Sequence, residues 1–150
     1  MDYNTRYRLY NAPPSPPVLR GIVVDDSPTV CNIISTMLRR CNIEVVSVAS
    51  AELALWYLAA LLQTGAPLPD FALIDIGLPG MDGIALVRYL ARKEQYAAID
   101  CIILSRRDGL ADRLKGRLAG AKVYLTKPFK RTDILETLRT LFPEQAALLE

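Results

Sequence analysis

The chain contains no histidine, and this absence excludes two large classes of functional site. Histidine-based catalytic triads and the commoner zinc sites both depend on an imidazole side chain. Cysteine is scarce as well: Cys31, Cys41 and Cys101 lack the spacing of a metal site, which favours buried free thiols in a reducing cytoplasm. We therefore expect a cytoplasmic protein whose chemistry depends on other side chains.

Long apolar runs and a strong net charge are also missing. No stretch reaches the roughly 20 residues that cross a bilayer, and residues 1–10 are polar and aromatic, unlike a signal peptide. The formal net charge is only +2, so the composition gives no electrostatic reason to expect nucleic acid or a membrane surface as a partner. The sequence therefore predicts no membrane span and no nucleic-acid partner.

The chain does have enough apolar content for one folded domain. Apolar residues make up 51% of its 150 residues, which is typical of a globular fold. Residues 13–17 are rich in proline, so we expect residues 1–19 to form an extended tail. The folded domain is expected to cover residues 20–142, and a short C-terminal extension, residues 143–150, follows it.

Strand-like and helical patterns alternate through this domain. The expected strands are 20–24, 43–48, 71–75, 100–104 and 122–126. The expected helices are 28–40, 51–63, 83–94, 109–119 and 131–141, and Pro143 closes the last of them. Such alternation predicts an α/β fold, with a doubly wound parallel sheet of five strands covered by helices on both faces.

The helix expected at 51–63 is apolar almost all the way round, whereas a surface helix normally keeps one polar face. One interpretation is generous burial in the core, with some ordinary exposed leucine. The other is that something covers this helix. The candidates are the tail, through Tyr3, Tyr7 and Tyr10, or a second protein.

Polar side chains stand at the ends of four of the expected strands. The set is Asp25 and Asp26 after the first strand, Asp75 at the end of the third, Ser105 after the fourth and Lys127 after the fifth. In open parallel sheets, ligands bind outside the carboxyl ends of the strands. Three acids in one small site need a cation, and Mg²⁺ is the hard ion that suits them. A carboxylate nucleophile beside a lysine and a hydroxyl is suited to receive a phosphoryl group, although each residue alone is compatible with ordinary turn or capping chemistry.

The segments around these positions carry a family resemblance. Residues 23–27, Asp75 with residues 78–83, Ser105, and residues 124–129 together resemble the receiver (CheY-like) domain of two-component response regulators. The resemblance covers about residues 20–142. It implies a flavodoxin-like sheet with strand order 2-1-3-4-5, and a phosphoacceptor signalling domain rather than an enzyme.

The resemblance also implies a role for each site residue. Asp75 would be the phosphoacceptor, supplied by a sensor histidine kinase or a phosphotransfer protein. The Mg²⁺ ligands would be Asp25, Asp26, Asp75 and the backbone carbonyl of Gly77. Lys127 would contact the phosphoryl group through a loop in which the Lys127–Pro128 bond is cis. Ser105 and Tyr124 would form the switch that carries the signal.

A narrower resemblance starts at Ser105 and runs through residue 129, and it is to CheY-like regulators of type IV pilus twitching motility and phototaxis. The expected output face, made by the fourth helix, fifth strand and fifth helix, is basic, which indicates either an acidic downstream protein or a merely solvated surface. Its cations are Arg107, Arg113, Lys115, Arg117, Lys122, Lys130 and Arg131. A second copy of the chain is a further candidate partner. Too little sequence follows Pro143 for an output domain, so we expect a stand-alone receiver.

Two residues depart from the family pattern. Arg106 stands where receivers usually carry a small residue, so it could fold over Asp75, grip the phosphoryl oxygens or point to water. Gly77 leaves no side chain beside the phosphoacceptor, or simply satisfies the backbone. They give weight to an alternative function, a receiver-like interaction or dimerisation scaffold with little phosphorylation. A small phosphatase is less favoured, because Gly77 occupies the position where a second acid would be needed.

Overall fold

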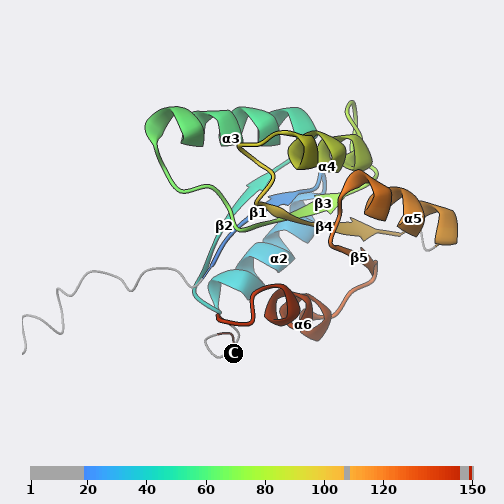
Figure 1. Cartoon of the computed structure of the whole chain (residues 1–150). Coiled ribbons are helices and arrows are strands. Elements are labelled where there is room, and N and C mark those ends of the chain that lie inside the picture. Colours follow the sequence, from blue (N-terminus) through green and yellow to red (C-terminus); the bar gives the residue numbers. More distant parts are fainter. Residues whose placement is uncertain (1–18, 107–108, 146–148, 150) are drawn as a thin grey trace, which may run out of the picture.

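The computed structural model describes residues 19–106, 109–145 and 149, and in them the predicted alternation is present (Figure 1). The strands are β1 (Leu19–Val24), β2 (Ile43–Val48), β3 (Phe71–Asp75), β4 (Asp100–Ser105) and β5 (Val123–Thr126). The helices are α2 (Pro28–Arg39), α3 (Ala51–Thr64), α4 (Gly83–Arg92), α5 (Leu110–Ala119) and α6 (Arg131–Leu141). The fourth and fifth helices of the sequence analysis are therefore α5 and α6. The expectations about the tail and Arg107 concern positions outside the described residues.

The five strands form one parallel sheet in the order β2-β1-β3-β4-β5, as the sequence predicts. The central strands β1 and β3 are buried on both faces, which explains why their sequences read as continuous apolar runs rather than alternating ones. This order makes β1 and β3 neighbours. Asp25, which follows β1, and Asp75, the last residue of β3, therefore lie at the same edge of the sheet.

Helices cover both faces of the sheet (Figure 1). On one face, α3, α4 and α5 contribute buried apolar side chains to a core that includes Ile22 and Ile74 of the sheet. On the other face, α2 and α6 pack against Val23 and Leu73, and Leu149 of the C-terminal extension joins this second core. None of the helices within the described part of the chain is long and apolar enough to cross a membrane.

The cysteines follow the prediction with one exception. Cys41 and Cys101 are buried thiols, and burial raises the pKa of the Cys101 thiol to about 12. Cys31 is only half-buried, because it lies on α2 beside the carboxyl end of β1, where its thiol donates to the carbonyl oxygen of Asp25 at 3.3 Å.

The apolar helix α3 is not fully buried. Its inward side consists of Ala51, Ala54 and Leu58, while Trp56 is 71% exposed. Core burial therefore accounts for the inward side of this helix, whereas Leu53, Leu62 and Trp56 are exposed.

Candidate functional site

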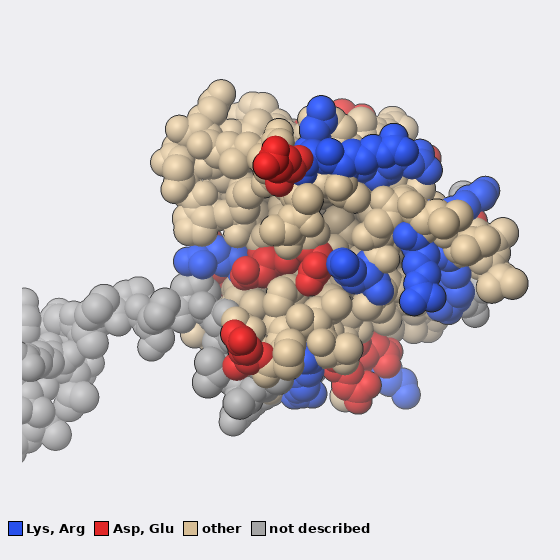
Figure 2. All heavy atoms as spheres, viewed as in Figure 1, with Lys and Arg blue, Asp and Glu red and all other residues tan. Residues whose placement is uncertain are grey.

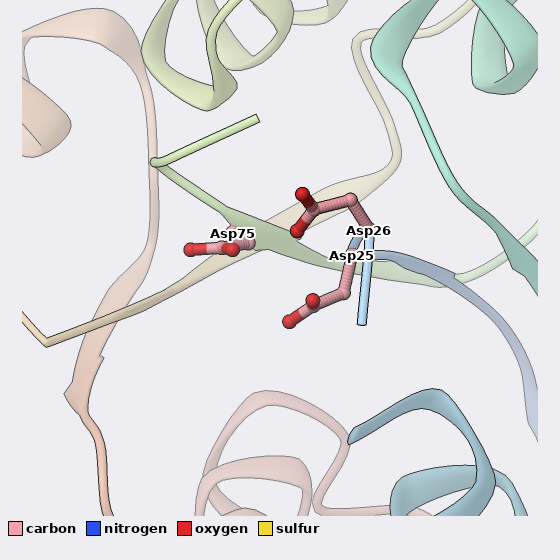
Figure 3. Close-up of side chains that lie close together, drawn as sticks. All are labelled: Asp25, Asp26 and Asp75. Atoms are coloured by element: carbon pink, nitrogen blue, oxygen red, sulfur yellow. The ribbon is translucent and has the colours of Figure 1, made fainter. Parts of the chain in front are cut away.

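The sheet register brings three carboxylates together. Val24 lies opposite Ile74, so Asp25, one residue further along, emerges level with Asp75 on the neighbouring strand. Asp26 follows directly. Each of the three acids offers a carboxylate oxygen within 4.8 Å of the others, and Figure 3 shows their side chains gathered beyond the ends of β1 and β3. The predicted acidic cluster is present.

Asp25 is the buried member of this cluster, with only 2% of its surface exposed. One carboxylate oxygen accepts a hydrogen bond from the backbone N–H of Ser27 at 2.9 Å, and the other accepts from Lys127 Nζ at 2.9 Å. Ser27 in turn caps α2, since its hydroxyl accepts from the N–H of Val30 at 3.3 Å. Asp25 and Ser27 therefore do make turn and capping hydrogen bonds, and Asp25 is at the same time a member of the acidic cluster.

Lys127 is not an ordinary loop charge. Its ammonium nitrogen lies 2.9 Å from Asp25 and 3.6 Å from Asp75, and its side chain is only 14% exposed. The backbone N–H of Lys127 donates to the carbonyl oxygen of Ser105 at 2.6 Å, which ties the end of β5 to the end of β4. The following bond, Lys127–Pro128, is cis, as the resemblance implies.

Asp75 is held in place by the loop that follows it. One of its carboxylate oxygens accepts from the N–H of Gly77 at 3.2 Å, so this oxygen is fixed toward the loop. A Cβ built on Gly77 would meet only this oxygen, at 4.0 Å, and the φ of Gly77 lies outside the left-handed region. The backbone therefore does not require glycine at position 77.

Gly83 has the opposite character, and the sequence analysis missed its role. A Cβ at this first residue of α4 would lie 2.8 Å from the carbonyl carbon of Asp75 and 2.9 Å from Cα of Ile76, and it would collide with the Asp75 carbonyl oxygen. The absence of a side chain lets α4 begin directly against the backbone of the acidic residue. Asp82 before it caps α4 by accepting from Ala85 N–H at 2.8 Å.

These side chains surround a cleft of about 250 Å³ at the carboxyl edge of the sheet. It is lined by Asp25, Asp26, Ser27, Val30, Asp75, Gly77, Ser105, Arg106 and Lys127. Ser105 is buried, with 3% of its surface exposed, so it is not a solvated turn residue. Arg106 is exposed but lines the same cleft, which places a second cationic side chain beside the acids.

The donor set fits a hard divalent cation. Three carboxylates and the single ammonium of Lys127 leave an excess of negative charge in a small volume. Oxygen ligands at this spacing are those that Mg²⁺ prefers in proteins, whereas zinc and copper favour nitrogen or sulfur ligands. The cleft can hold such an ion and offer a carboxylate nucleophile beside a fixed positive charge.

The predicted switch residue Tyr124 lies half-buried on β5, at some distance along the strand from the cleft. The guanidinium carbon of Arg113 on α5 lies 5.2 Å from the centre of its ring, and Arg113 also donates to the hydroxyl of Thr126 at 2.9 Å. Gly116 gives the ring room, since a Cβ there would lie 3.3 Å from Tyr124 Cδ2. No local sequence pattern indicates these contacts of Arg113 with Tyr124 and Thr126.

The surface beside Tyr124 is basic and partly apolar. Figure 2 shows Lys and Arg gathered toward the right of the view, on the side where α4 and α5 lie. A hollow of about 310 Å³ lies between α5 and β5, and the described residues that line it include cations but no acid. The residues around it are Leu110, Arg113, Leu114, Arg117, Ala121, Lys122, Val123 and Tyr124.

A second contact that the sequence did not reveal connects α3 to the site. The carboxylate of Glu52 accepts a hydrogen bond from the backbone N–H of Met81 at 3.0 Å, so the loop between β3 and α4 is tied to the start of α3. This bond is the main cause that lowers the pKa of Glu52.

Comparison with known proteins gives one consistent result. Residues 22–139 match the sequence profile of the response regulator receiver domain. Protein PilH of Pseudomonas aeruginosa is 31% identical over 122 residues, which are 81% of this chain and 96% of that protein. Protein PilG of the same organism is 29% identical over 125 residues, covering 83% of this chain and 88% of that protein.

The fold gives the same result. The crystal structure of the chemotaxis protein CheY4 of Vibrio cholerae superposes with a TM-score of 0.73 at 25% identity. The superposition covers 83% of this chain and 98% of that structure. Sequence and fold therefore agree on one family.

Proposed function

The chain belongs to the family of response regulator receiver domains, and we propose that it works as a phosphorylation switch in which Asp75 is the phosphoacceptor. One observation carries the proposal most directly. Lys127 Nζ lies between Asp25 and Asp75, at 2.9 Å and 3.6 Å from their carboxylate oxygens, in a cleft that also holds Asp26. Among the three acids of the cleft, Asp25 is buried, Asp26 is exposed and Asp75 is half-buried.

The proposed reaction is a transfer of a phosphoryl group from a phosphohistidine on a sensor kinase or phosphotransfer protein. A carboxylate oxygen of Asp75 forms an O–P bond while the P–N bond breaks, and the imidazole of the donor leaves with the electron pair. Reversal of the signal needs water to attack phosphorus, which breaks the O–P bond and releases inorganic phosphate. Lys127 would offset the negative charge on the transferring oxygens.

Mg²⁺ is the proposed cofactor, and bound Mg²⁺ would supply neutralising charge to the phosphoryl oxygens. Its protein ligands would be Asp25, Asp26, Asp75 and the carbonyl oxygen of Gly77. The clustering of the three carboxylates within 4.8 Å supports this assignment. Lys127 orients Asp25 for this role, because it holds that carboxylate at hydrogen-bond distance.

The signal would pass from the cleft to the surface through Ser105 and Tyr124. The Ser105 hydroxyl would donate to a phosphoryl oxygen, and the space it leaves would let Tyr124 turn inward, which shifts the population between two packings. Burial of Ser105 and half-burial of Tyr124 on the neighbouring strand support this route. Replacing Ser105 by alanine should keep the phosphoryl label but remove the shift that phosphorylation causes in the spectrum of fluorine-labelled tyrosines.

The output partner is proposed to be a protein with an acidic, partly apolar docking segment. The hollow between α5 and β5 supports this, since its leucines offer apolar contact while Arg113, Arg117 and Lys122 offer positive charge. Control of pilus motility or taxis is the process we propose, supported by the narrower resemblance after Ser105 and by the relatives named PilG and PilH. The cytoplasm is the proposed location, since that is where such a kinase would phosphorylate it.

The experiment uses a small phosphodonor such as acetyl phosphate, with Mg²⁺ or with a chelator. Intact mass should increase by one phosphoryl group only with Mg²⁺, and Asp75→Asn should abolish the increase. Glu94→Gln, an exposed acid outside the cleft, serves as the matched control and should be labelled like wild type. A folded protein that binds Mg²⁺ but takes no label would favour the scaffold function instead.

A further inference from the structure

The outer side of α3 carries an uncharged apolar strip that no described residue covers. We define the α3 strip as Leu53, Trp56, Ala59, Ala60 and Leu62. Trp56 is 71% exposed, Leu53 49% and Leu62 42%. Exposed apolar surface of this kind on a small protein usually marks a place where another surface docks.

The strip is centred on Trp56. Residues three and four positions apart face the same way on a helix, so Leu53 lies on one side of the indole and Ala59 and Ala60 lie on the other. The strip therefore presents a large protruding side chain beside two small ones. A tryptophan in such a setting typically supplies a large share of the binding energy of an interface.

None of the five strip residues is charged, and the nearest charge is that of Glu52, which lies one helical turn before Trp56 on the same face. The only charged residue of α3 is Glu52, in its first turn, and the carboxylate of Glu52 is held by the N–H of Met81 at 3.0 Å. In Figure 2 the surface over most of α3, at the upper left, is almost free of coloured charge. This neutrality distinguishes α3 from the other exposed apolar helix.

That other helix, α5, exposes Leu110, Leu114 and Leu118, but cations stand between these leucines. Arg113 and Arg117 are both exposed, so two α5 surfaces facing each other would bring like charges together. The α5 surface therefore suits an acidic partner, whereas the α3 strip suits a neutral apolar one.

We propose that the α3 strip is a self-association surface, and that its occupant is the same strip on a second copy of this chain. A two-fold interface needs a patch that is complementary to itself. An axis passing between Trp56 and Ala60, near the middle of α3, would set each indole against the small alanines of the partner helix. Each indole would then bury on the order of 200 Å², in a contact without charge.

This proposal does not depend on phosphorylation of Asp75. No strip residue is among those that line the acidic cleft, and the α3 residues that face the core are Ala51, Ala54 and Leu58. The one connection is Glu52, which links the start of α3 to the loop after β3. Self-association is therefore testable on the unphosphorylated protein.

Trp56 is the only tryptophan of the chain, so its fluorescence reports directly on the strip. We expect the chain of residues 1–150 to sediment as a dimer of 16.6 kDa subunits at high concentration and as a monomer on dilution. The emission maximum should move to longer wavelength over the same concentration range, because dilution returns the indole to water. Coincidence of the two transitions is the predicted result.

A matched pair of variants tests the location. Leu53→Glu places a charge in the strip and should weaken the dimer by at least about tenfold, whereas Leu118→Glu makes the same change on α5 and should leave it intact. Thermal unfolding of both variants checks that they are folded. Weakening by Leu118→Glu alone would overturn the proposal.

Two further outcomes would also overturn it. A monomer at every concentration with a long-wavelength emission would mean that the strip stays in water. A monomer with a short-wavelength emission that does not change on dilution would mean that another segment of the same chain, rather than a second copy, lies over α3.

Discussion

The ammonium nitrogen of Lys127 lies 2.9 Å from a carboxylate oxygen of Asp25, although the two residues are 102 positions apart in the sequence. The side chain of Asp25 is 1% exposed and that of Lys127 is 14% exposed, so water screens this pair poorly. The same ammonium is 3.6 Å from Asp75. Lys127 therefore both compensates a buried acid and stands beside the proposed phosphoacceptor.

Removing this cation should destabilise the fold as well as the site. Lys127→Met leaves Asp25 buried without its partner, so we expect the free energy of unfolding to fall by about 3 kcal/mol. Lys115→Met, which changes an exposed lysine on α5, should stay within about 0.5 kcal/mol of wild type. Urea denaturation measures both. Asp25→Asn added to Lys127→Met should recover much of the loss, and no recovery would contradict the pairing.

Gly77 and Gly83, which both follow Asp75, should respond differently to alanine. Gly83→Ala drives a Cβ into the backbone of Asp75 and Ile76, so we expect a loss of about 2 kcal/mol or more, against the helix propensity that favours alanine. Gly77→Ala has open space and should be nearly neutral for stability. Thermal denaturation of the two variants provides the comparison. Equal stability of the two would show that α4 does not rest on the Asp75 backbone.

Arg106 should slow the hydrolysis of the phosphorylated form. Arg106 lines the cleft, so its guanidinium either binds phosphoryl oxygens or hinders the approach of water. In both cases its removal should speed hydrolysis of the aspartyl phosphate. We expect Arg106→Ala to shorten the lifetime by about tenfold, the size of one charge-assisted hydrogen bond. Intact mass followed over time after removal of the phosphodonor gives the rate. Arg92→Ala, on the exposed end of α4, is the control. An unchanged or longer lifetime in Arg106→Ala would mean that the arginine points to water.

Asp100 should make stability depend on pH. Burial raises the pKa of this carboxyl, and the charge of Asp70 adds to the effect while Lys122 opposes it. Because the folded state holds the proton more tightly than the unfolded state, the free energy of unfolding falls as pH rises above the unfolded-state pKa of about 3.9. Asp100→Asn should therefore unfold at a higher temperature than wild type at neutral pH.

The difference between Asp100→Asn and wild type should shrink as the pH is lowered toward that unfolded-state value. Scanning calorimetry over a series of pH values is the measurement. Glu136→Gln, an exposed acid on α6, is the control and should follow wild type throughout. A difference that is constant with pH would rule out the burial of this charge as its cause.

Much of the fold follows from the sequence because its signals are local. The apolar run before Asp75 and the Ser27-Pro28 start of α2 predict a strand and a helix without any knowledge of the rest. Parallel pairing then brings the strand ends to one edge, so the meeting of Asp25 and Asp75 also follows. Lys127 belongs to the same class, since it ends β5 at that edge.

The features that the sequence did not predict depend on contacts between residues far apart in the chain. The clamp of Arg113 on Tyr124 and Thr126 depends on how α5 lies against β5, which no local pattern encodes. The need for glycine at position 83 depends on the approach of α4 to Asp75, and Gly77 shows that a neighbouring glycine carries no such need. Trp56 is an intermediate case, because its helix looked apolar in sequence but only the packing shows which side faces out.

The central claim is that Asp75 becomes an acyl phosphate, and its position can be read directly. Borohydride reduces an acyl phosphate to an alcohol, so the modified aspartate becomes a stable homoserine that peptide mass spectrometry can locate. After treatment with Mg²⁺ and a phosphodonor, we predict homoserine in place of Asp75 and aspartate at both Asp25 and Asp26. Homoserine in place of Asp25 or Asp26, or none at Asp75 in a protein whose mass has increased, would contradict the claim.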